Sequence, residues 1–281
     1  MKVINVIAEL KEIVTSLKKQ GKTIGFVPTM GYFHEGHLTL MRTAAEKTDY
    51  VVASIFVNPL QFGAGEDFEE YPRDLERDIS LADSTGVKLV FTPGTAEMYP
   101  TGYATFVEVG QLTDKLCGGS RPGHFRGVAT VVTKLFNIVN PDIAFFGQKD
   151  AQQALVLKKM AEDLNINVEI EIVPIVREPD GLAMSSRNKY LSSEERKSAL
   201  VLSKALSLAQ ALIKSGARNT VELKREIINF ISREPAARID YVDILSFPGL
   251  KEIENINGQV IVALAVFIAG TRLIDNVILE V

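Results

Sequence analysis

The sequence contains a single cysteine, Cys117, among its 281 residues. One thiol cannot form a disulfide within the chain or a cysteine-based metal site, and a lone cysteine fits a reducing compartment. A long hydrophobic run is also missing, because the most apolar stretch, residues 260–269, has about half of the ~20 residues that a membrane helix needs. Residues 1–14 lack a clean signal-peptide core. These absences predict a cytoplasmic protein with no membrane partner.

An excess of basic residues is missing as well. Lysine and arginine number 31 against 35 aspartate and glutamate, which gives a net charge of −4. A nucleic-acid-binding domain usually carries a basic footprint, so no nucleic-acid partner is expected. With 46% hydrophobic and 23% charged residues the composition is that of a globular protein, long enough for one large domain or two ordinary ones.

Short apolar segments alternate with amphipathic segments over the first 175 residues. Strands are expected at 23–28, 50–57, 87–91, 143–146 and 168–173, and helices at 5–19, 38–47, 71–84, 128–139 and 150–163. This alternation is typical of a parallel sheet with helices on both faces. We therefore predict a doubly wound, Rossmann-like α/β domain over residues 1–176.

The rest of the chain follows a different pattern. Ser192 and Glu195 have the spacing of a capping box, which predicts a helix that continues to Lys214. A second helix is expected at 221–232, and strands at 237–245 and within 259–281. This pattern predicts a smaller C-terminal α+β domain, residues 177–281.

The first expected strand leads into the segment PTMGYFHEGH, residues 28–37. Doubly wound sheets bind ligands at the carboxyl ends of their strands. Gly31 and Gly36 allow close approach of the backbone, and His34 and His37 fall at the start of the next helix, whose N–H groups favour an anion such as phosphate. An imidazole N–H can donate to an oxygen on which negative charge develops. The alternative is a pair of histidines on a solvated loop.

Two other interpretations of this segment fail, a zinc-protease site and a Walker phosphate-binding loop. Zinc proteases place two histidines at i and i+4 on a helix, whereas His34 and His37 stand at i and i+3 with a helix-breaking glycine between them. A third metal ligand to join them and Glu35 cannot be placed. A Walker motif is absent. Metal ligation is therefore not expected here.

Two further clusters carry groups suited to phosphate. Ser185, Ser186 and Arg187 follow a turn that would make their loop mobile, and hydroxyls beside an arginine can clamp a polyphosphate. Lys149, at an expected strand-to-helix junction, supplies a point charge, and Asp150 can accept a ribose hydroxyl. The alternatives are an ordinary surface for the serines and helix capping for Asp150.

Together the three clusters resemble the HIGH and KMSKS signatures of the nucleotidylyltransferase and class I synthetase superfamily. The segments PTMGYFHEGH, FVNPLQFG, YPRDLERD, GGSRPGHFRGV, FFGQKDAQQ and VREPDGLAMSSRN occur in the order typical of the pantothenate synthetase (pantoate–β-alanine ligase) family. The resemblance implies that pantoate attacks the α-phosphate of MgATP to give pantoyl adenylate and pyrophosphate. The β-alanine amine then displaces AMP to give pantothenate.

The resemblance also implies a set of site residues. The catalytic residues are His37 as an acid-type group, His34 and Lys149. The ATP-binding residues are Met30, Gly31, His34, Gly36, His37, Gly147, Gln148, Lys149, Asp150, Val176, Met184, Ser185, Ser186 and Arg187. Gln61 and Gln153 are assigned to pantoate, whose hydroxyls and carboxylate suit amide groups. ATP is expected with Mg²⁺, but no metal ligand is assigned; a homodimer is implied, and the smaller domain is expected to act as a lid.

Several alternatives stay open at this point. Arg121, His124 and Arg126 lie in a basic, glycine-rich segment that either closes over the site or supports it. Asp78 could reach a magnesium ion, although its charged neighbours favour a solvated helix face. The other functions considered are a nucleotidylyltransferase, which would need a cationic acceptor site, a tRNA synthetase, for which no anticodon domain is evident, and a non-catalytic nucleotide sensor.

Overall fold

A computed structural model describes the whole chain, residues 1–281. It contains two compact units. The first comprises Met1–Gln111, Arg121–Gln148 and Gln153–Pro174, and the second comprises Leu112–Ser120, Lys149–Gln152 and Ile175–Val281. Two short segments from the first 176 residues thus belong to the second unit, so this division is not the contiguous one expected from the sequence. The predicted domains, 1–176 and 177–281, stay a prediction.

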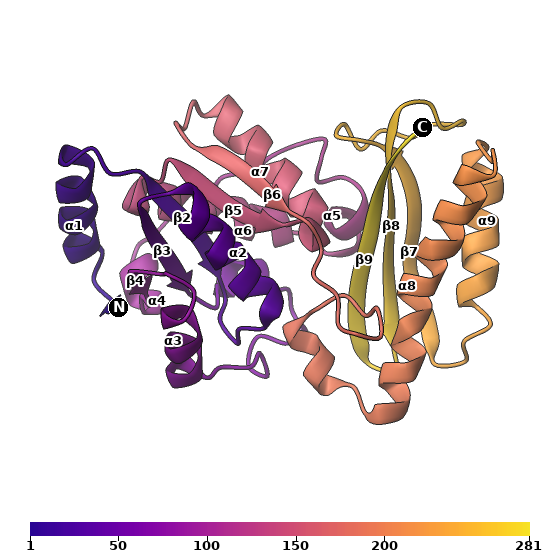
Figure 1. Ribbon diagram of the computed structural model, residues 1–281, viewed down its shortest axis with the longest axis horizontal. Coiled ribbons are helices and arrows are strands. Elements are labelled where there is room, and N and C mark those ends of the chain that lie inside the picture. Colours follow the sequence, from indigo (N-terminus) through magenta and orange to yellow (C-terminus); the bar gives the residue numbers. More distant parts are fainter. The chain divides into compact units, whose positions relative to one another are not determined.

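The first unit is built on a six-stranded sheet with the strand order β1-β4-β3-β2-β5-β6 (Figure 1). The strands are β1 (Lys2–Ile4), β2 (Ile24–Thr29), β3 (Tyr50–Ile55), β4 (Leu89–Phe91), β5 (Ile143–Gly147) and β6 (Glu169–Val173). All neighbouring pairs are parallel. From β2 the chain moves outward through β3 to β4 and then returns to β5 on the other side of β2. The topological switch point, where such sheets bind ligands, therefore lies between β2 and β5.

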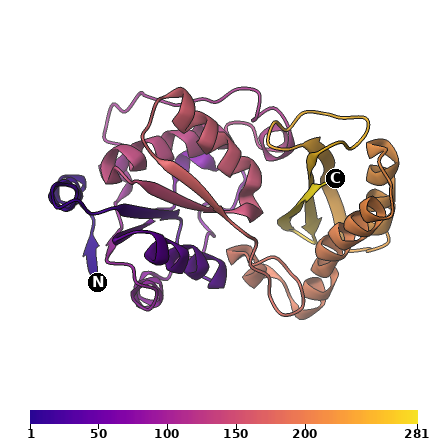
Figure 2. The ribbon, with the colours of Figure 1, turned by 45° about the horizontal axis from the view of Figure 1, so that its top comes forward.

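Helices cover both faces of this sheet (Figures 1 and 2). The helices along this part of the chain are α1 (Ile7–Lys19), α2 (Glu35–Lys47), α3 (Leu75–Asp83), α4 (Thr95–Met98), α6 (His124–Val139) and α7 (Ala151–Asp163). Met41 of α2 and Ala82 of α3 share a buried cluster with Val27 of β2. The preceding residue, Phe26, points to the opposite face and meets Phe136 of α6, with ring centroids 6.5 Å apart. The predicted doubly wound α/β fold is confirmed.

The second unit contains a three-stranded antiparallel sheet, β7 (Ala237–Ser246), β8 (Gln259–Ile268) and β9 (Thr271–Glu280). Helices α8 (Ser193–Lys214) and α9 (Thr220–Ile231) lie side by side along one face, packed on Val262 and Leu264 of β8 (Figure 1). The short helix α5 (Leu116–Ser120) contacts β7 and β8. The predicted capping box is present, since Ser192 and Glu195 exchange side-chain-to-backbone hydrogen bonds of 2.7 and 3.3 Å.

Differences from the predicted elements concern short elements and helix starts. Helix α2 begins at Glu35, so Gly36 lies in its first turn and does not break it; the helix-breaking interpretation is wrong. A single glycine costs only about 1 kcal/mol relative to alanine in a helix, through its backbone entropy, so it weakens this turn without ending the helix. Helix α6 begins at His124 rather than Val128. Elements β1, α4 and α5 were not predicted, because three to five residues are too few to show a period. None of the helices is both long and apolar enough to cross a membrane.

Candidate active site

The turn between β2 and α2 has a strained backbone. Gly31 has φ +87° and Tyr32 has φ +53°, both in the left-handed region. A Cβ on Gly31 would lie 2.9 Å from a carboxylate oxygen of Asp78 and from a methyl group of Ile55, so only glycine fits there. The N–H of Gly31 donates to the hydroxyl of Thr29 at 3.1 Å. The turn is thus held in one conformation directly at the end of the central strand.

Asp78 of α3 supports this turn. Its side chain is 1% exposed, and its two carboxylate oxygens accept the N–H groups of Tyr32 at 2.6 Å and Phe33 at 2.7 Å. Burial raises the pKa of Asp78, although these two donors oppose the rise. The expected solvated helix face is therefore wrong for this residue. Asp74 caps α3, and Asp78, one turn later, faces the core of the unit.

His34 and His37 lie at the N-terminus of α2. His34 is the N-cap, and the two ring centroids are 4.1 Å apart. The Nδ1 atom of His37 accepts the backbone N–H of His34 at 3.3 Å. A ring nitrogen that accepts carries no proton, so the neutral ring of His37 has its proton on Nε2. The site therefore combines an imidazole donor with the positive end of a helix dipole.

The neighbouring strand β5 ends at Gly147, at the same edge of the sheet. A Cβ added to Gly147 would meet no protein atom within 4 Å, so the fold itself does not require glycine here. Gln148 follows in a 3-10 turn. The ends of β2 and β5 thus carry the predicted ATP residues of the first unit: Met30, Gly31, His34, Gly36, His37, Gly147 and Gln148.

Gln61 belongs to the 3-10 turn η1 (Pro59–Gln61), which follows β3. Its side-chain oxygen accepts from Nδ2 of Asn58 at 3.0 Å, and its Nε2 donates to the sulfur of Met30 at 3.2 Å. Asn58 is 1% exposed; it also donates to the carbonyl of Gly127 and accepts the hydroxyl of Tyr99 at 2.8 Å. The Gln61 amide therefore reaches the β2–α2 turn.

Sequence reasoning did not single out Asn58 or Tyr99. The Asn-Pro dipeptide is a signal for a turn. It does not reveal that Asn58 contacts a carbonyl 69 residues later in the chain.

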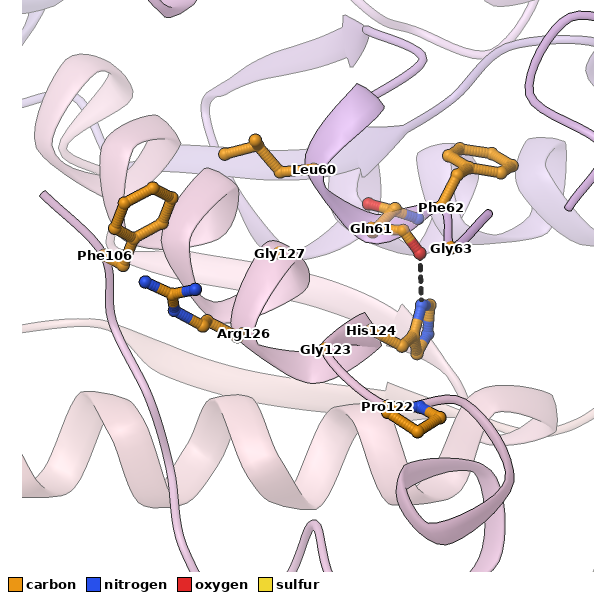
Figure 3. Close-up of a pocket in the computed structure, with 10 residues that line it drawn as sticks. All are labelled: Leu60, Gln61, Phe62, Gly63, Phe106, Pro122, Gly123, His124, Arg126 and Gly127. Carbon is orange, nitrogen blue, oxygen red and sulfur yellow. Dashed lines mark hydrogen bonds between the residues drawn. The ribbon is translucent and has the colours of Figure 1, made fainter. Parts of the chain in front are cut away.

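A pocket of about 260 Å³ opens beside η1 (Figure 3). Its walls come from η1, from the start of α6 and from the segment before it: Leu60, Gln61, Phe62, Gly63, Phe106, Pro122, Gly123, His124, Arg126 and Gly127. On one side the guanidinium of Arg126 stacks on the ring of Phe106 at 3.9 Å. Pockets that hold drug-sized ligands have volumes of about 300 Å³ or more, so this pocket suits a ligand smaller than that.

Arg121 and His124 contact the Gln61 turn. Arg121 forms a two-pronged ion pair with Glu66, at 2.6 and 2.7 Å. The Nε2 atom of His124 lies 3.1 Å from Nη1 of Arg121. Its Nδ1 atom lies 2.9 Å from the carbonyl oxygen of Gln61 (Figure 3). Burial by itself raises the pKa of Glu66, but the hydrogen bonds and charge of Arg121 outweigh it and lower this pKa to about 2. The basic segment around Arg121 and His124 was expected either to close over the site or to support it, and these contacts favour support.

The second unit carries the serine-rich cluster. The carbonyl of Val176 accepts the N–H of Met184 at 3.0 Å, which closes a turn. Ser185 caps a 3-10 helix and its hydroxyl accepts the N–H of Arg187 at 3.2 Å, while Ser186 is buried. The residues predicted to clamp a polyphosphate thus have a defined local structure.

Ion pairs anchor the turn that precedes this cluster. Arg177 binds both oxygens of the buried Asp275 in β9, at 2.7 and 3.0 Å. Arg196 of α8 binds Glu178 at 2.6 Å and Asp180 at 2.8 Å. The turn is therefore tied to a strand and a helix of its own unit.

Lys149 also belongs to the second unit. Its Nζ lies 3.5 Å from the carboxylate of Asp150, which is half-exposed, and its backbone carbonyl accepts from Asn276 of β9 at 3.0 Å. Gln153, by contrast, lies in the first unit on the first turn of α7 and is half-buried.

The side chains do not offer a cage for a metal ion. No group of three or more histidine, cysteine, aspartate or glutamate residues is placed to hold one. Both oxygens of Asp78 already accept backbone N–H groups. The residues present therefore do not fit a Mg²⁺ ion held by protein side chains alone.

Comparisons with known proteins agree over the whole chain. A model of the pantoate-beta-alanine ligase family matches residues 2–278. A pantothenate synthetase of Pelotomaculum thermopropionicum is 60% identical over 279 residues, 99% of each chain. The pantothenate synthetase of Thermus thermophilus superposes with a TM-score of 0.94 at 46% identity and covers 99% of each chain. The Francisella tularensis enzyme, a pantoate-beta-alanine ligase complexed with beta-gamma ATP and beta-alanine, has a TM-score of 0.80 at 35% identity, over 99% of this chain and 97% of that one.

Proposed function

Since the chain belongs to the pantoate–β-alanine ligase family, we propose that it joins pantoate to β-alanine with ATP through a pantoyl-adenylate intermediate. In the first step a carboxylate oxygen of pantoate bonds to the α-phosphorus of ATP, and the bond to pyrophosphate breaks. In the second step the β-alanine amine bonds to the acyl carbon, the bond to AMP breaks and the amine loses its extra proton. Activation must come first, because a free carboxylate is a poor electrophile.

His37 is the proposed catalytic donor of the first step. Attack on the α-phosphate brings two anions together, so the phosphate oxygens gain negative charge that donors must stabilise. The Nε2–H of His37 and the N–H groups at the start of α2 are donors of this kind. Lys149 and Arg187 add positive charge, and His34 holds His37 through its backbone N–H. The hydrogen bond from the His34 N–H to Nδ1 of His37, which leaves Nε2 as the donor at the switch point, is the observation that carries the proposal.

The remaining ATP contacts are proposed for backbone and hydroxyl groups. Gly147 offers open space beside its backbone, and Ser185 and Ser186 offer hydroxyls. The full proposed set is Met30, Gly31, His34, Gly36, His37, Gly147, Gln148, Lys149, Asp150, Val176, Met184, Ser185, Ser186 and Arg187. ATP is proposed to arrive as its magnesium complex, in which the phosphates hold the ion.

Gln61 and Gln153 are proposed for pantoate. The Gln61 amide is directed to Met30, at the end of β2, by Asn58. A sulfur atom is a weak acceptor, so a pantoate hydroxyl or carboxylate would be a better partner for the Gln61 N–H. The homodimer and the cytoplasmic location stay predictions.

The test is isotope exchange between labelled pyrophosphate and ATP, measured with and without pantoate and with no β-alanine present. Exchange that depends on pantoate would support a reversible adenylate step and would identify the acid substrate at the same time. If the protein binds ATP but shows no exchange, the adenylate route is refuted.

A further inference from the structure

The first turn of α6 holds η1 at three points. A Cβ on Gly127 would overlap the carbonyl of Leu60, so the two backbones touch and only glycine fits between them. The carbonyl of Gly127 accepts from Asn58 at 3.2 Å. At the first residue of α6, Nδ1 of His124 lies 2.9 Å from the carbonyl oxygen of Gln61. The Gln61 backbone is thus fixed by α6, while its side chain extends to Met30.

The two neighbours of His124 determine which ring nitrogen carries the proton. A carbonyl oxygen can only accept, so Nδ1 must be the donor in the bond to Gln61. A guanidinium can only donate, so Nε2 must accept from Arg121 at 3.1 Å. Both constraints give the same state, a neutral imidazole with its proton on Nδ1. A doubly protonated ring would direct an N–H at the cation of Arg121.

Glu66 fixes the orientation of the Arg121 guanidinium. Its two oxygens bind Nε and Nη2 of Arg121, and the ion pair is largely buried. A planar guanidinium held in this way presents Nη1 in a fixed direction. The contacts therefore lead from Glu66 through Arg121 and His124 to the carbonyl oxygen of Gln61. The same oxygen also accepts directly from Nη2 of Arg121, at the longer distance of 3.4 Å.

We propose that His124 is a positioning residue for the acid substrate, which acts through Gln61. In its Nδ1–H form, maintained by Arg121 and Glu66, it fixes the backbone of η1 and so directs the Gln61 amide toward the β2–α2 turn. His124 itself does not touch the reacting atoms. This inference rests on the proposed assignment of Gln61 to pantoate.

The kinetic test compares two nearly isosteric variants. His124→Asn retains an N–H donor close to the position of Nδ1, whereas His124→Asp places an acceptor there. We expect His124→Asp to raise the KM for pantoate about tenfold, the effect of losing one net hydrogen bond, with the KM for ATP unchanged. His124→Asn should stay close to the wild type. Asn137→Ala, an exposed change at the other end of α6, is the control. A purely structural role would lower the active fraction, and so kcat, equally in both variants.

A double-mutant cycle tests whether the effect passes through Gln61. In the Gln61→Ala background, His124→Asp should have no further effect on the KM for pantoate, because the amide that it positions is gone. Additive effects of the two changes would overturn the proposal.

The tautomer can be observed without turnover. The chain has three histidines, so ring ¹⁵N resonances can be assigned by loss of one set in His124→Asn. We expect a protonated Nδ1 and an unprotonated Nε2 at neutral pH, and loss of this preference in Arg121→Met. A proton on Nε2 would overturn the inference. If the wild type lacks pantoate-dependent exchange, the proposed function fails instead, whatever the tautomer.

Discussion

The side chain of His37 both caps the N-terminus of α2 and supplies a hydrogen-bond donor to the site. Its Nδ1 accepts the N–H of His34, one of the backbone donors that a helix N-terminus would otherwise leave without a partner. The same hydrogen bond sets the proton on Nε2. Helix capping and the supply of a donor are therefore coupled in this residue, and a substitution must be chosen so that the two effects can be separated.

We expect His37→Ala to reduce adenylate formation by about 10² to 10³, the usual cost of removing one donor to a developing oxyanion. Loss of the cap should cost only about 1 kcal/mol of stability. Single-turnover formation of pantoyl adenylate measures the first effect, and urea unfolding measures the second. Thr39→Ala, which removes a side-chain-to-backbone bond in the same helix, is the control. An unchanged single-turnover rate in folded His37→Ala would rule out the assigned role.

Gly147 provides a test of ATP binding. A methyl group at this position meets no protein atom, so Gly147→Ala should change the stability by no more than about 0.5 kcal/mol. If the backbone here contacts the nucleotide, the same methyl group should raise the Kd for ATP about tenfold, as calorimetry can measure. Gly94→Ala is matched, because a Cβ there also meets nothing. Equal ATP affinity in the two variants would contradict the contact.

At the scale of elements, α3 fixes the β2–α2 turn through Asp78. Asp78→Asn replaces one of the two acceptors by an NH₂ group that faces a backbone N–H. We therefore expect a loss of about 1–3 kcal/mol in the free energy of unfolding, measured in urea. Asp74→Asn is the control in the same helix, because asparagine caps as well as aspartate and the charge change is identical. The prediction is wrong if the two variants lose the same stability.

The ion pair between Glu66 and Arg121, which joins two segments far apart in the chain, predicts that the free energy of unfolding depends on pH. The pKa of Glu66 is about 2 in the folded chain against 4.5 for the ordinary group, so its ion pair with Arg121 stabilises the native state fully above pH 4.5. The contribution, at most ~3 kcal/mol, disappears as the pH falls from 4.5 toward 2. Glu66→Gln should therefore be less stable than the wild type at pH 6 and more nearly equal to it at pH 3, by urea unfolding. A difference that is the same at both values would count against this pair.

At the scale of the whole molecule, the structural features that the sequence predicts are those that depend on a local pattern of residues. Apolar runs indicate the central strands, and the spacing of Ser192 and Glu195 indicates the start of α8. It does not predict that Asp78 turns inward, because its charged neighbours look solvated and its partners lie in another element. The same limit applies to Arg121 and Glu66, 55 residues apart. Such pairs depend on how strands and helices pack, which no local period encodes.

Ligand-linked stability tests the residue assignments in the intact protein. ATP at 100 times its Kd should raise the free energy of unfolding by about 2.7 kcal/mol, and pantoate should add its own increment. Lys149→Met should lose most of the ATP increment, whereas Lys158→Met, an exposed change on α7, should retain it. Gln61→Ala should retain the ATP increment and lose that of pantoate, measured with an ATP analogue that cannot be cleaved at the α-phosphate. Because each variant is compared with its own ligand-free form, a general loss of stability cancels. Equal loss of both increments in Gln61→Ala would therefore mean that this amide does not discriminate the acid from the nucleotide.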